Sequence, residues 1–302
     1  MECLKILPIA LGLTLFFDAQ CFAKQARCEG LTENISHTDV FSLSNGDIFE
    51  LPVIAHDFAF VSFVGWLDLE KLALILQKDN LYPLAFYGRA LGAISAYKYQ
   101  KTSEGQFNEL YFTAFASSQA SQNTFVSIVE LLKNIRFIAT SPNPDVSLYH
   151  LNSYSNNSSW YIASEEIWGI PSELAEIEIN IENNQQGFSL RENNKSILQA
   201  LVSKQIKTPN FFGGDVHLYA SAGGKASGRV KYSPVEACGQ TRIGFLNNKN
   251  VLRISSVEEN RAPAHPLIAN LKELNFEPLL VQVGNNLQAI QYAPLGDESV
   301  FR

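Results

Sequence analysis

The feature that most constrains the fold is a succession of short aromatic and β-branched runs separated by turn residues. Phe58–Val64 is a continuous apolar run, which predicts a buried strand. Further strands are predicted at Leu91–Tyr99, Glu109–Ala116, Trp160–Ala163 and Leu174–Ile181. Turns or loops are predicted at Gly105, Asn143–Asn157, Gly169–Pro171, Gly213–Gly214, Gly223–Gly224 and Gly284. So many short segments favour a largely β architecture, with a β-meander toward the C-terminus.

A few helices are expected among these strands. Asp68 is placed to cap a helix over Leu69–Lys78, where leucines fall on one face at three- and four-residue spacing. Pro83 follows as a stop signal. Further helices are predicted at Thr124–Arg136, Ser196–Lys204 and Pro266–Leu274. This mixture predicts an α+β protein containing a barrel or a sandwich.

The N-terminus has the pattern of a secretory signal peptide. Lys5 precedes the apolar run Ile6–Phe17, and the small residue Ala23 follows at the expected cleavage position. The run is shorter than the roughly 20 residues of a membrane span. We therefore expect residues 1–23 to be removed and residues 24–302 to form a single secreted or periplasmic domain with no membrane span. The alternative is a retained hydrophobic anchor.

The cysteines are consistent with export. Cleavage after Ala23 leaves Cys28 and Cys238, an even pair in an oxidising compartment. A disulfide between them would tie the mature N-terminus to a distant segment. Two unrelated buried thiols are the alternative.

Composition and motifs exclude several classes of function. The formal net charge is −7 and lysines and arginines are scattered, so a nucleic-acid surface is not expected. The five histidines are far apart and no HExxH or GxSxG motif occurs, so we predict neither a metal site nor a cofactor, and no α/β-hydrolase elbow. A small-molecule ligand is the expected partner, and the sequence leaves the oligomeric state open.

Two segments resemble the acetoacetate decarboxylase superfamily. They are Tyr97–Glu109, which ends in Gly-x-Phe-x-Glu, and Ser164–Ala175, which contains Glu-x-x-Gly-x-Pro before Leu-Ala. The resemblance spans roughly residues 58 to 181. It implies a cone-shaped β-barrel with flanking helices and a cavity inside the barrel.

The chain departs from this family at the positions that carry its chemistry. The decarboxylase has two adjacent lysines after the proline of the turn, where this chain has Ser172 and Glu173. A second carboxylate and an arginine of the family map near Ile94 and Ser164, so both are missing. Neither Ser172 nor Glu173 can form an imine, so the family mechanism is not expected. Lys225 and Lys231 are the remaining lysines to consider for imine chemistry.

Several residues are candidates for the site. The catalytic candidates are Glu109, Glu165 and Glu166. The candidates for substrate binding are Arg89, Tyr97, Trp168 and Ser172. A carboxylate in a strand or a pair in a turn could act as acid and base, and an arginine could pair with a substrate carboxylate. Structural roles remain the alternative for each: a solvated turn, core packing or a capped loop.

Two functions of different classes follow. The first is an exported protein that binds a small oxo-acid or apolar metabolite in its barrel and acts on it as a lyase or hydratase through non-covalent acid/base catalysis. The second is a non-enzymatic binding or accessory protein that has lost the chemistry of the family. A third, weaker hypothesis is an enzyme that uses a different lysine.

Overall fold

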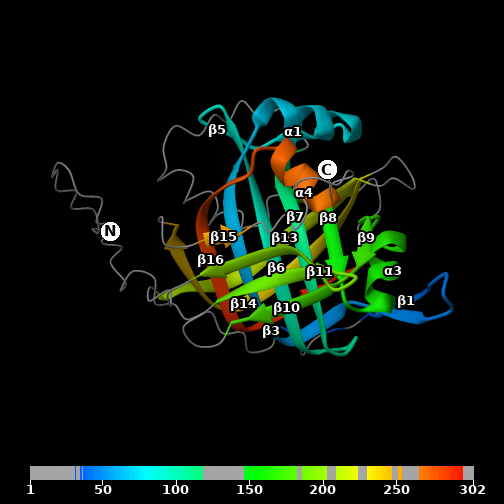
Figure 1. Ribbon diagram of the computed structural model, residues 1–302. Coiled ribbons are helices and arrows are strands. Elements are labelled where there is room, and N and C mark those ends of the chain that lie inside the picture. The colour runs from blue at the N-terminus through cyan, green and yellow to red at the C-terminus, as the bar shows by residue number, and fades with distance from the viewer. Residues whose placement is uncertain are drawn as a thin grey trace, which may run out of the picture.

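The fold was obtained as a computed structural model, which describes residues 37–117, 146–181, 186–202, 209–223, 230–246, 251–253 and 265–294 and positions 31 and 35 (Figure 1). Some predicted features lie outside these residues: the signal peptide, Cys28, the helix Thr124–Arg136 and Lys225.

One large sheet of ten strands dominates the molecule. Along its hydrogen-bonded order the strands are β4 (Tyr82–Pro83), β7 (Phe107–Ser117), β6 (Arg89–Thr102), β3 (Val53–Leu67), β16 (Glu277–Gln291), β14 (Val230–Phe245), β13 (Pro209–Gly223), β8 (Val146–Ser155) and β9 (Ser172–Leu174). The short strand β5 (Ala85–Phe86) pairs with β6 off this path. Strand β8 pairs in parallel with β13 and β9, and it also pairs antiparallel with β7.

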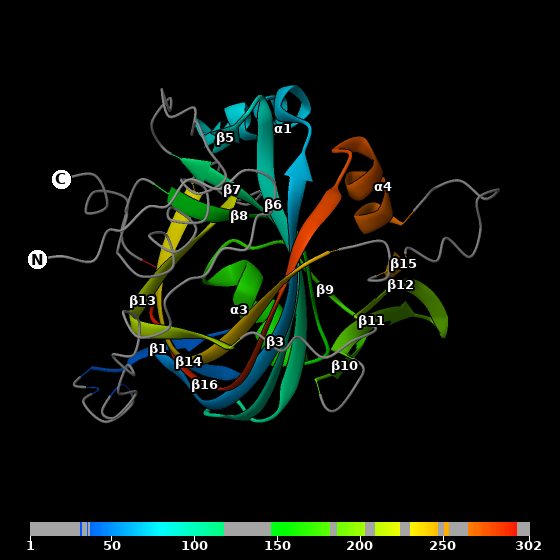
Figure 2. The same cartoon turned by 90° about the vertical axis from the view of Figure 1, so that its left-hand side faces the viewer.

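Two smaller sheets accompany it. Strands β10 (Glu176–Asn180), β11 (Gln186–Glu192), β12 (Lys195–Val202) and β15 (Val251–Arg253) form an antiparallel sheet, drawn beside the main sheet in Figure 2. Strands β1 (Asp39–Ser42) and β2 (Ile48–Leu51) form an antiparallel hairpin.

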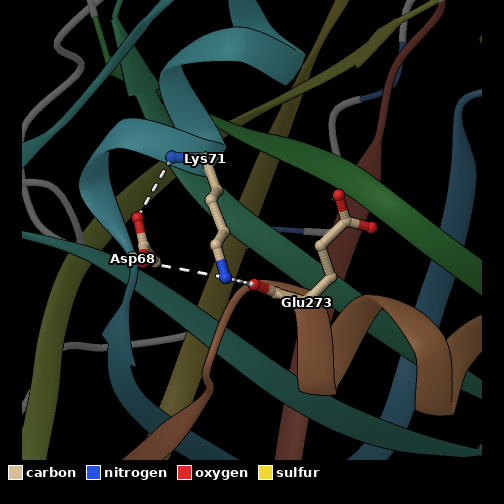
Figure 3. A network of polar contacts seen from close by, with 3 residues as sticks. All are labelled: Asp68, Lys71 and Glu273. Carbon is tan, nitrogen blue, oxygen red and sulfur yellow. Dashed lines mark hydrogen bonds and ion pairs between the residues drawn. The ribbon is translucent and has the colours of Figure 1, made fainter.

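Four short helical segments complete the described fold: α1 (Leu69–Leu76), the 3-10 turn η2 (Gln77–Asp79), α3 (Ser158–Glu166) and α4 (Pro266–Glu273). The Asp68 carboxylate accepts a hydrogen bond from Lys71 N at 3.1 Å and so caps α1, as predicted. Lys71 Nζ in turn donates to the carbonyl oxygen of Glu273 at 2.9 Å, which ties α1 to the end of α4 (Figure 3). None of the described helices is long and apolar enough to span a membrane.

The larger hydrophobic core lies on one face of the main sheet, which we call the outer face. Alternate residues of β3, β6, β7 and β16 point to this face because side chains alternate along a strand. They pack against α1, α4 and the sheet of β10, β11 and β12. The outer-face residues used below are Ala59, Val61, Phe63, Ile94, Ala96, Leu110, Phe112, Val281 and Val283.

Most of the predicted elements are confirmed. The segment Phe58–Val64 lies within β3, and Leu91–Tyr99 and Glu109–Ala116 lie within β6 and β7. The helices predicted after Asp68 and from Pro266 are α1 and α4. The α+β class is therefore confirmed.

The helix predicted at Ser196–Lys204 is wrong, because this segment contributes the strand β12. The preceding residues Asn193 and Asn194 both have positive φ, of 49° and 62°. Two left-handed residues in succession form the kind of tight turn that joins antiparallel strands, and asparagine tolerates that conformation. The turn thus sets β12 against β11, and alternate residues of β12 become buried.

The turns predicted at Gly213–Gly214 and Gly284 are wrong, because these positions lie within β13 and β16, where the strand register shifts.

Two more predictions are wrong for related reasons. Trp160–Ala163 belongs to helix α3 rather than to a strand, because the Asn157 side chain accepts from Trp160 N at 2.9 Å and caps the helix. Asn143–Asn157 was expected to be a loop, yet most of it forms β8. The serines of β8 obscure the pattern, since Ser153 and Ser155 are buried polar residues within the sheet.

Candidate functional site

The face of the main sheet opposite the outer face, which we call the inner face, carries a concentration of polar groups. Register places residues of four strands in rows across it: Phe60, Tyr97, Glu109 and Ser155 in one row, and Ser62, Ser95, Tyr111 and Ser153 in the next. A third row contains Val64, Ala93, Thr113 and His150. The alternation that fills the outer face with apolar groups therefore gathers hydroxyls and one carboxylate on the inner face.

Glu109 is the most unusual residue of these rows. Glu109 is only 1% exposed, although its side chain carries a carboxyl group. The hydroxyl of Tyr111 and the indole Nε1–H of Trp160 both donate to Oε1. No described residue forms a hydrogen bond with Oε2, which is also buried. A buried polar atom without a partner costs free energy, so this oxygen is a position where a ligand atom could bind.

The environment of Glu109 raises its pKa close to neutral pH. Burial raises its pKa from 4.5 to about 7, and the hydrogen bonds from Tyr111 and Trp160 oppose this rise only in part. At neutral pH the carboxyl group is then present in both protonation states. That property suits a general acid or base.

Three tyrosines surround this carboxyl group. The ring of Tyr97 lies 5.8 Å from that of Tyr111 and 6.4 Å from that of Tyr99, measured between centroids. Burial, followed by the charge of Glu109, raises the pKa of Tyr99 and of Tyr111 well above the ordinary value, and burial raises that of Tyr97 to about 12. All three rings nevertheless keep intermediate exposure. These tyrosines therefore retain surface that a ligand could contact.

A belt of hydroxyl groups crosses the inner face beside Glu109. Ser62 Oγ and Ser95 Oγ are 2.7 Å apart, and Ser153 Oγ and Ser172 Oγ are 3.0 Å apart. All four serines are buried. Further along β8, the buried His150 places its ring 4.8 Å from the ring of Tyr111. These groups could orient a polar ligand by hydrogen bonds.

Helix α3 delivers Trp160 to this face, and its end explains the Glu-x-x-Gly-x-Pro motif. Gly169 has φ +70°, and its N–H donates to Glu165 O at 3.0 Å, while Ile170 N donates to Ser164 O at 2.8 Å. This is the hydrogen-bond pattern of a glycine that ends a helix. The motif therefore stops α3 and leads the chain into β9, where Ser172 reaches Ser153.

The predicted site residues divide into two groups in the structure. Glu109, Tyr97 and Ser172 lie together on the inner face. Trp168 is buried against Trp160 in a separate apolar cluster, and its Nε1–H donates to Ser233 Oγ at 3.2 Å.

The remaining predicted residues lie elsewhere. Glu165 and Glu166 are exposed, and the Glu166 carboxylate accepts from Ser44 N at 3.1 Å. Arg89, the first residue of β6, forms an ion pair with Glu277 at 2.5 Å, and its guanidinium group lies over the ring of Trp66. The structure thus does not bring Glu165, Glu166 or Arg89 to Glu109. Of the predicted disulfide pair, Cys238 is buried in β14 and Cys28 lies outside the described residues.

Sequence reasoning missed Tyr111, Trp160, Ser95, Ser153 and His150. A usable signal exists for two of them, because Ser95 and Tyr111 share the two-residue alternation of Tyr97 and Glu109. The cap at Asn157 indicates a helix that contains Trp160, but it does not indicate the contact with Glu109. Ser153 and His150 lie on a strand that the sequence does not predict.

Two other features of the described residues concern metal ions and surface grooves. No group of three or more His, Cys, Asp or Glu side chains in the described part of the chain is arranged to hold a metal ion. An open groove of about 570 Å³ lies on the small sheet, lined by Asn156, Leu174–Glu178 and Arg191–Asn193.

Comparison with known proteins identifies the fold. No protein-family model and no curated protein matches the sequence. Among solved structures, acetoacetate decarboxylase from Legionella pneumophila subsp. pneumophila str. Philadelphia 1 aligns with a TM-score of 0.51 and 13% identity, covering 80% of this chain and 86% of that one. The enduracididine biosynthesis enzyme MppR with HEPES bound aligns with a TM-score of 0.53 and 10% identity, covering 82% and 89%. MppR complexed with pyruvate aligns with a TM-score of 0.51 and 11% identity, covering 82% and 91%. The chain therefore has the acetoacetate-decarboxylase-like fold, as its two motifs predict.

Proposed function

We propose that this protein is a divergent member of the acetoacetate-decarboxylase-like superfamily that binds a small molecule inside a cone-shaped barrel. The pairing of strands supports the barrel, because β7, β6, β3, β16, β14, β13 and β8 each pair with the next and β8 pairs again with β7. The inner face would then line the barrel cavity. MppR binds pyruvate on this fold, which makes an oxo-acid a natural first probe.

The chemistry that the geometry supports best is non-covalent acid/base catalysis by Glu109. The observation that carries this proposal is a buried carboxyl group with one oxygen held by Tyr111 and Trp160 and the other without a partner. The bound oxygen fixes the orientation of the group, and the other can take or give a proton. Its pKa of about 7 favours proton exchange at neutral pH. A lyase or hydratase step would use this exchange.

A non-enzymatic binding protein is the second candidate. It is favoured by the placement of the other charged candidates, since Glu165, Glu166 and Arg89 lie away from Glu109. A site with one titratable carboxyl group and several hydroxyls can hold a ligand without transforming it. The two functions share the cavity and differ in whether Glu109 transfers a proton.

Imine chemistry at the family's lysine positions is not part of the proposal. Ser172 is buried and shares a hydrogen bond with Ser153, and Glu173 is exposed. Incubation with acetoacetate and borohydride is expected to leave the mass of the protein unchanged and to give no acetone. A trapped adduct would contradict this, and peptide mapping would show whether Lys225, Lys231 or another lysine forms it.

Ligand-observed NMR with pyruvate, acetoacetate and a set of neutral C4–C6 compounds tests the proposed site. We expect at least one compound to bind to the wild-type chain and its affinity to change in Glu109→Gln. Glu70→Gln, the same chemical change at an exposed residue of α1, is the control. Turnover that is lost in Glu109→Gln while binding persists would select the enzyme. Binding that is indifferent to Glu109 would contradict the proposal.

Export is proposed from the N-terminal pattern and the surviving cysteine pair. Intact-mass analysis of the exported protein is expected to show a chain that begins after Ala23. Non-reducing peptide mapping is expected to link Cys28 to Cys238. A mature chain that still begins at Met1, or two alkylatable thiols in the native protein, would contradict these expectations.

A further inference from the structure

The charge pattern around Glu109 narrows the class of ligand. In the three described rows of the inner face, Glu109 is the one acidic side chain and no lysine or arginine occurs. The influences on its pKa are burial and hydrogen bonds, and no positive charge contributes. The carboxylate form is therefore buried without a counter-charge in the described part of the chain. Such a group is costly unless something positive or strongly donating approaches it.

The aromatic rings beside Glu109 independently favour a cationic ligand. Tyr97, Tyr99 and Tyr111 retain accessible surface, and the ring of Trp160 lies 6.3 Å from that of Tyr99. The face of an aromatic ring carries partial negative charge and attracts cations within about 6 Å. An aliphatic ammonium would meet both the rings and the unpartnered Oε2. An anion would meet the same carboxylate and rings with no described cation to offset the repulsion.

We propose that the ligand of this site presents an organic ammonium group, which donates to Oε2 of Glu109 and lies against the rings of Tyr97, Tyr99 and Tyr111. This inference rests on the proposed binding function and replaces the oxo-acid by an amine as the ligand class. The hydroxyls of Ser62, Ser95 and Ser153, one row away, would contact the polar remainder of the ligand.

The tyrosines near Glu109 carry no charge around neutral pH, so they do not replace its carboxylate as the anionic partner of a ligand. Tyr97 and Tyr99 face it from β6 and Tyr111 faces it from β7, and the pKa of each is raised above its ordinary value, so each stays neutral. Trp160, which faces it from α3, does not titrate. The ring of His150, from β8, lies 4.8 Å from that of Tyr111. Measurements at pH 8 keep Glu109 ionised, because this pH lies above its pKa of about 7.

The test compares three molecules of nearly equal size that differ in charge: n-butylammonium, 1-butanol and butyrate. Calorimetric titration of the mature chain at pH 8 is expected to show binding of butylammonium at least about tenfold tighter than of the other two. Glu109→Gln should remove most of that preference, while Glu70→Gln should keep it. Lowering the pH to 6 should weaken binding of butylammonium to the wild type, because Glu109 becomes protonated, and should have little effect in Glu109→Gln.

The outcomes separate this inference from the function on which it rests. Equal or tighter binding of butyrate or 1-butanol overturns the ammonium inference and leaves the binding site standing. Pyruvate in the same titration makes the same distinction: binding of pyruvate without binding of butylammonium overturns only the inference. An unchanged preference in Glu109→Gln, with circular dichroism showing that the variant is folded, also overturns it.

Discussion

The two faces of strands β3, β6 and β7 differ sharply in chemistry. On the outer face, alternate residues such as Phe63, Ile94 and Phe112 are fully buried and apolar, and they pack under two helices and a second sheet. On the inner face, the intervening positions carry Ser62, Ser95, Tyr111 and Glu109. Residues that are adjacent in sequence therefore have different roles: one side chain stabilises the core and the next contributes to the candidate site.

The outer face stabilises the fold, whereas the inner face carries a carboxyl group whose burial is unfavourable. Burial of apolar surface on the outer face favours folding. Burial of the Glu109 carboxylate opposes folding, because the charged form loses its hydration. A costly group retained in a position that stabilising residues could fill is a functional candidate.

Removing a large outer-face side chain should have the largest effect on stability. Phe112 is fully buried and its ring lies 5.6 Å from that of Phe276. Phe112→Ala should lower the free energy of unfolding by about 3–5 kcal/mol, because it removes apolar contacts and leaves a cavity. Urea denaturation measures this change. A loss below about 1 kcal/mol would mean that the outer face is not the main stabilising core.

Glu109→Gln should change how stability depends on pH. Burial raises the pKa of Glu109 from 4.5 to about 7, so the folded state holds this proton more tightly than the unfolded state. The stability that this proton contributes is fully present below pH 4.5 and is lost as the pH rises through about 7. The variant lacks this loss. Relative to wild type it should gain about 3 kcal/mol between pH 4.5 and pH 8.

Urea denaturation at several pH values measures this gain. Glutamine still offers an oxygen to Tyr111 and Trp160, so the comparison isolates the charge. Glu70→Gln is the matched control and should follow the wild-type profile. Parallel profiles for wild type and Glu109→Gln would show that Glu109 titrates as an ordinary surface carboxylate does.

Gly169→Ala should disturb the inner face through the backbone. Gly169 has φ +70°, a left-handed conformation that costs an alanine about 1–2 kcal/mol. Thermal unfolding measures the loss. Gly169→Asn should lose less, because asparagine tolerates this conformation. Equal stability of all three proteins would contradict the role of Gly169 in ending α3.

The smallest effect is expected within the hydroxyl belt. Ser95→Ala leaves the buried hydroxyl of Ser62 without its partner and should cost about 1 kcal/mol. The double variant Ser62→Ala with Ser95→Ala removes both groups and should be close to wild type in stability. The free energies of unfolding of wild type, the two single variants and the double variant, measured by denaturant titration, form a double-mutant cycle. Additive losses would show that the two hydroxyls do not interact.

The sequence predicts most of the sheet because its strands have strong local signals. The apolar run in β3 and the alternation in β6 and β7 require little tertiary information. The cap at Asp68 and the proline that opens α4 likewise define helices locally. Glu109 was found in the same way, as a carboxylate in an otherwise apolar strand.

The rest of the site depends on contacts between distant segments. Trp160 reaches Glu109 because α3 packs on the inner face, and nothing in its local sequence indicates that partner. The run of four apolar and aromatic residues there resembles a strand, while the asparagine cap that precedes it favours a helix. Glu165 and Glu166 lie on the exposed side of the same helix. They are therefore distant from Glu109, although they are only a few residues from Trp160 in the sequence.

The proposed role of Glu109 requires a buried carboxyl group that exchanges its proton near neutral pH. Infrared difference spectroscopy of wild type against Glu109→Gln isolates the carbonyl stretch of this one group across a pH titration. A protonated carboxyl band that disappears with a midpoint near pH 7 is the predicted result. A midpoint near 4.5, the ordinary value of a glutamate, would contradict the account.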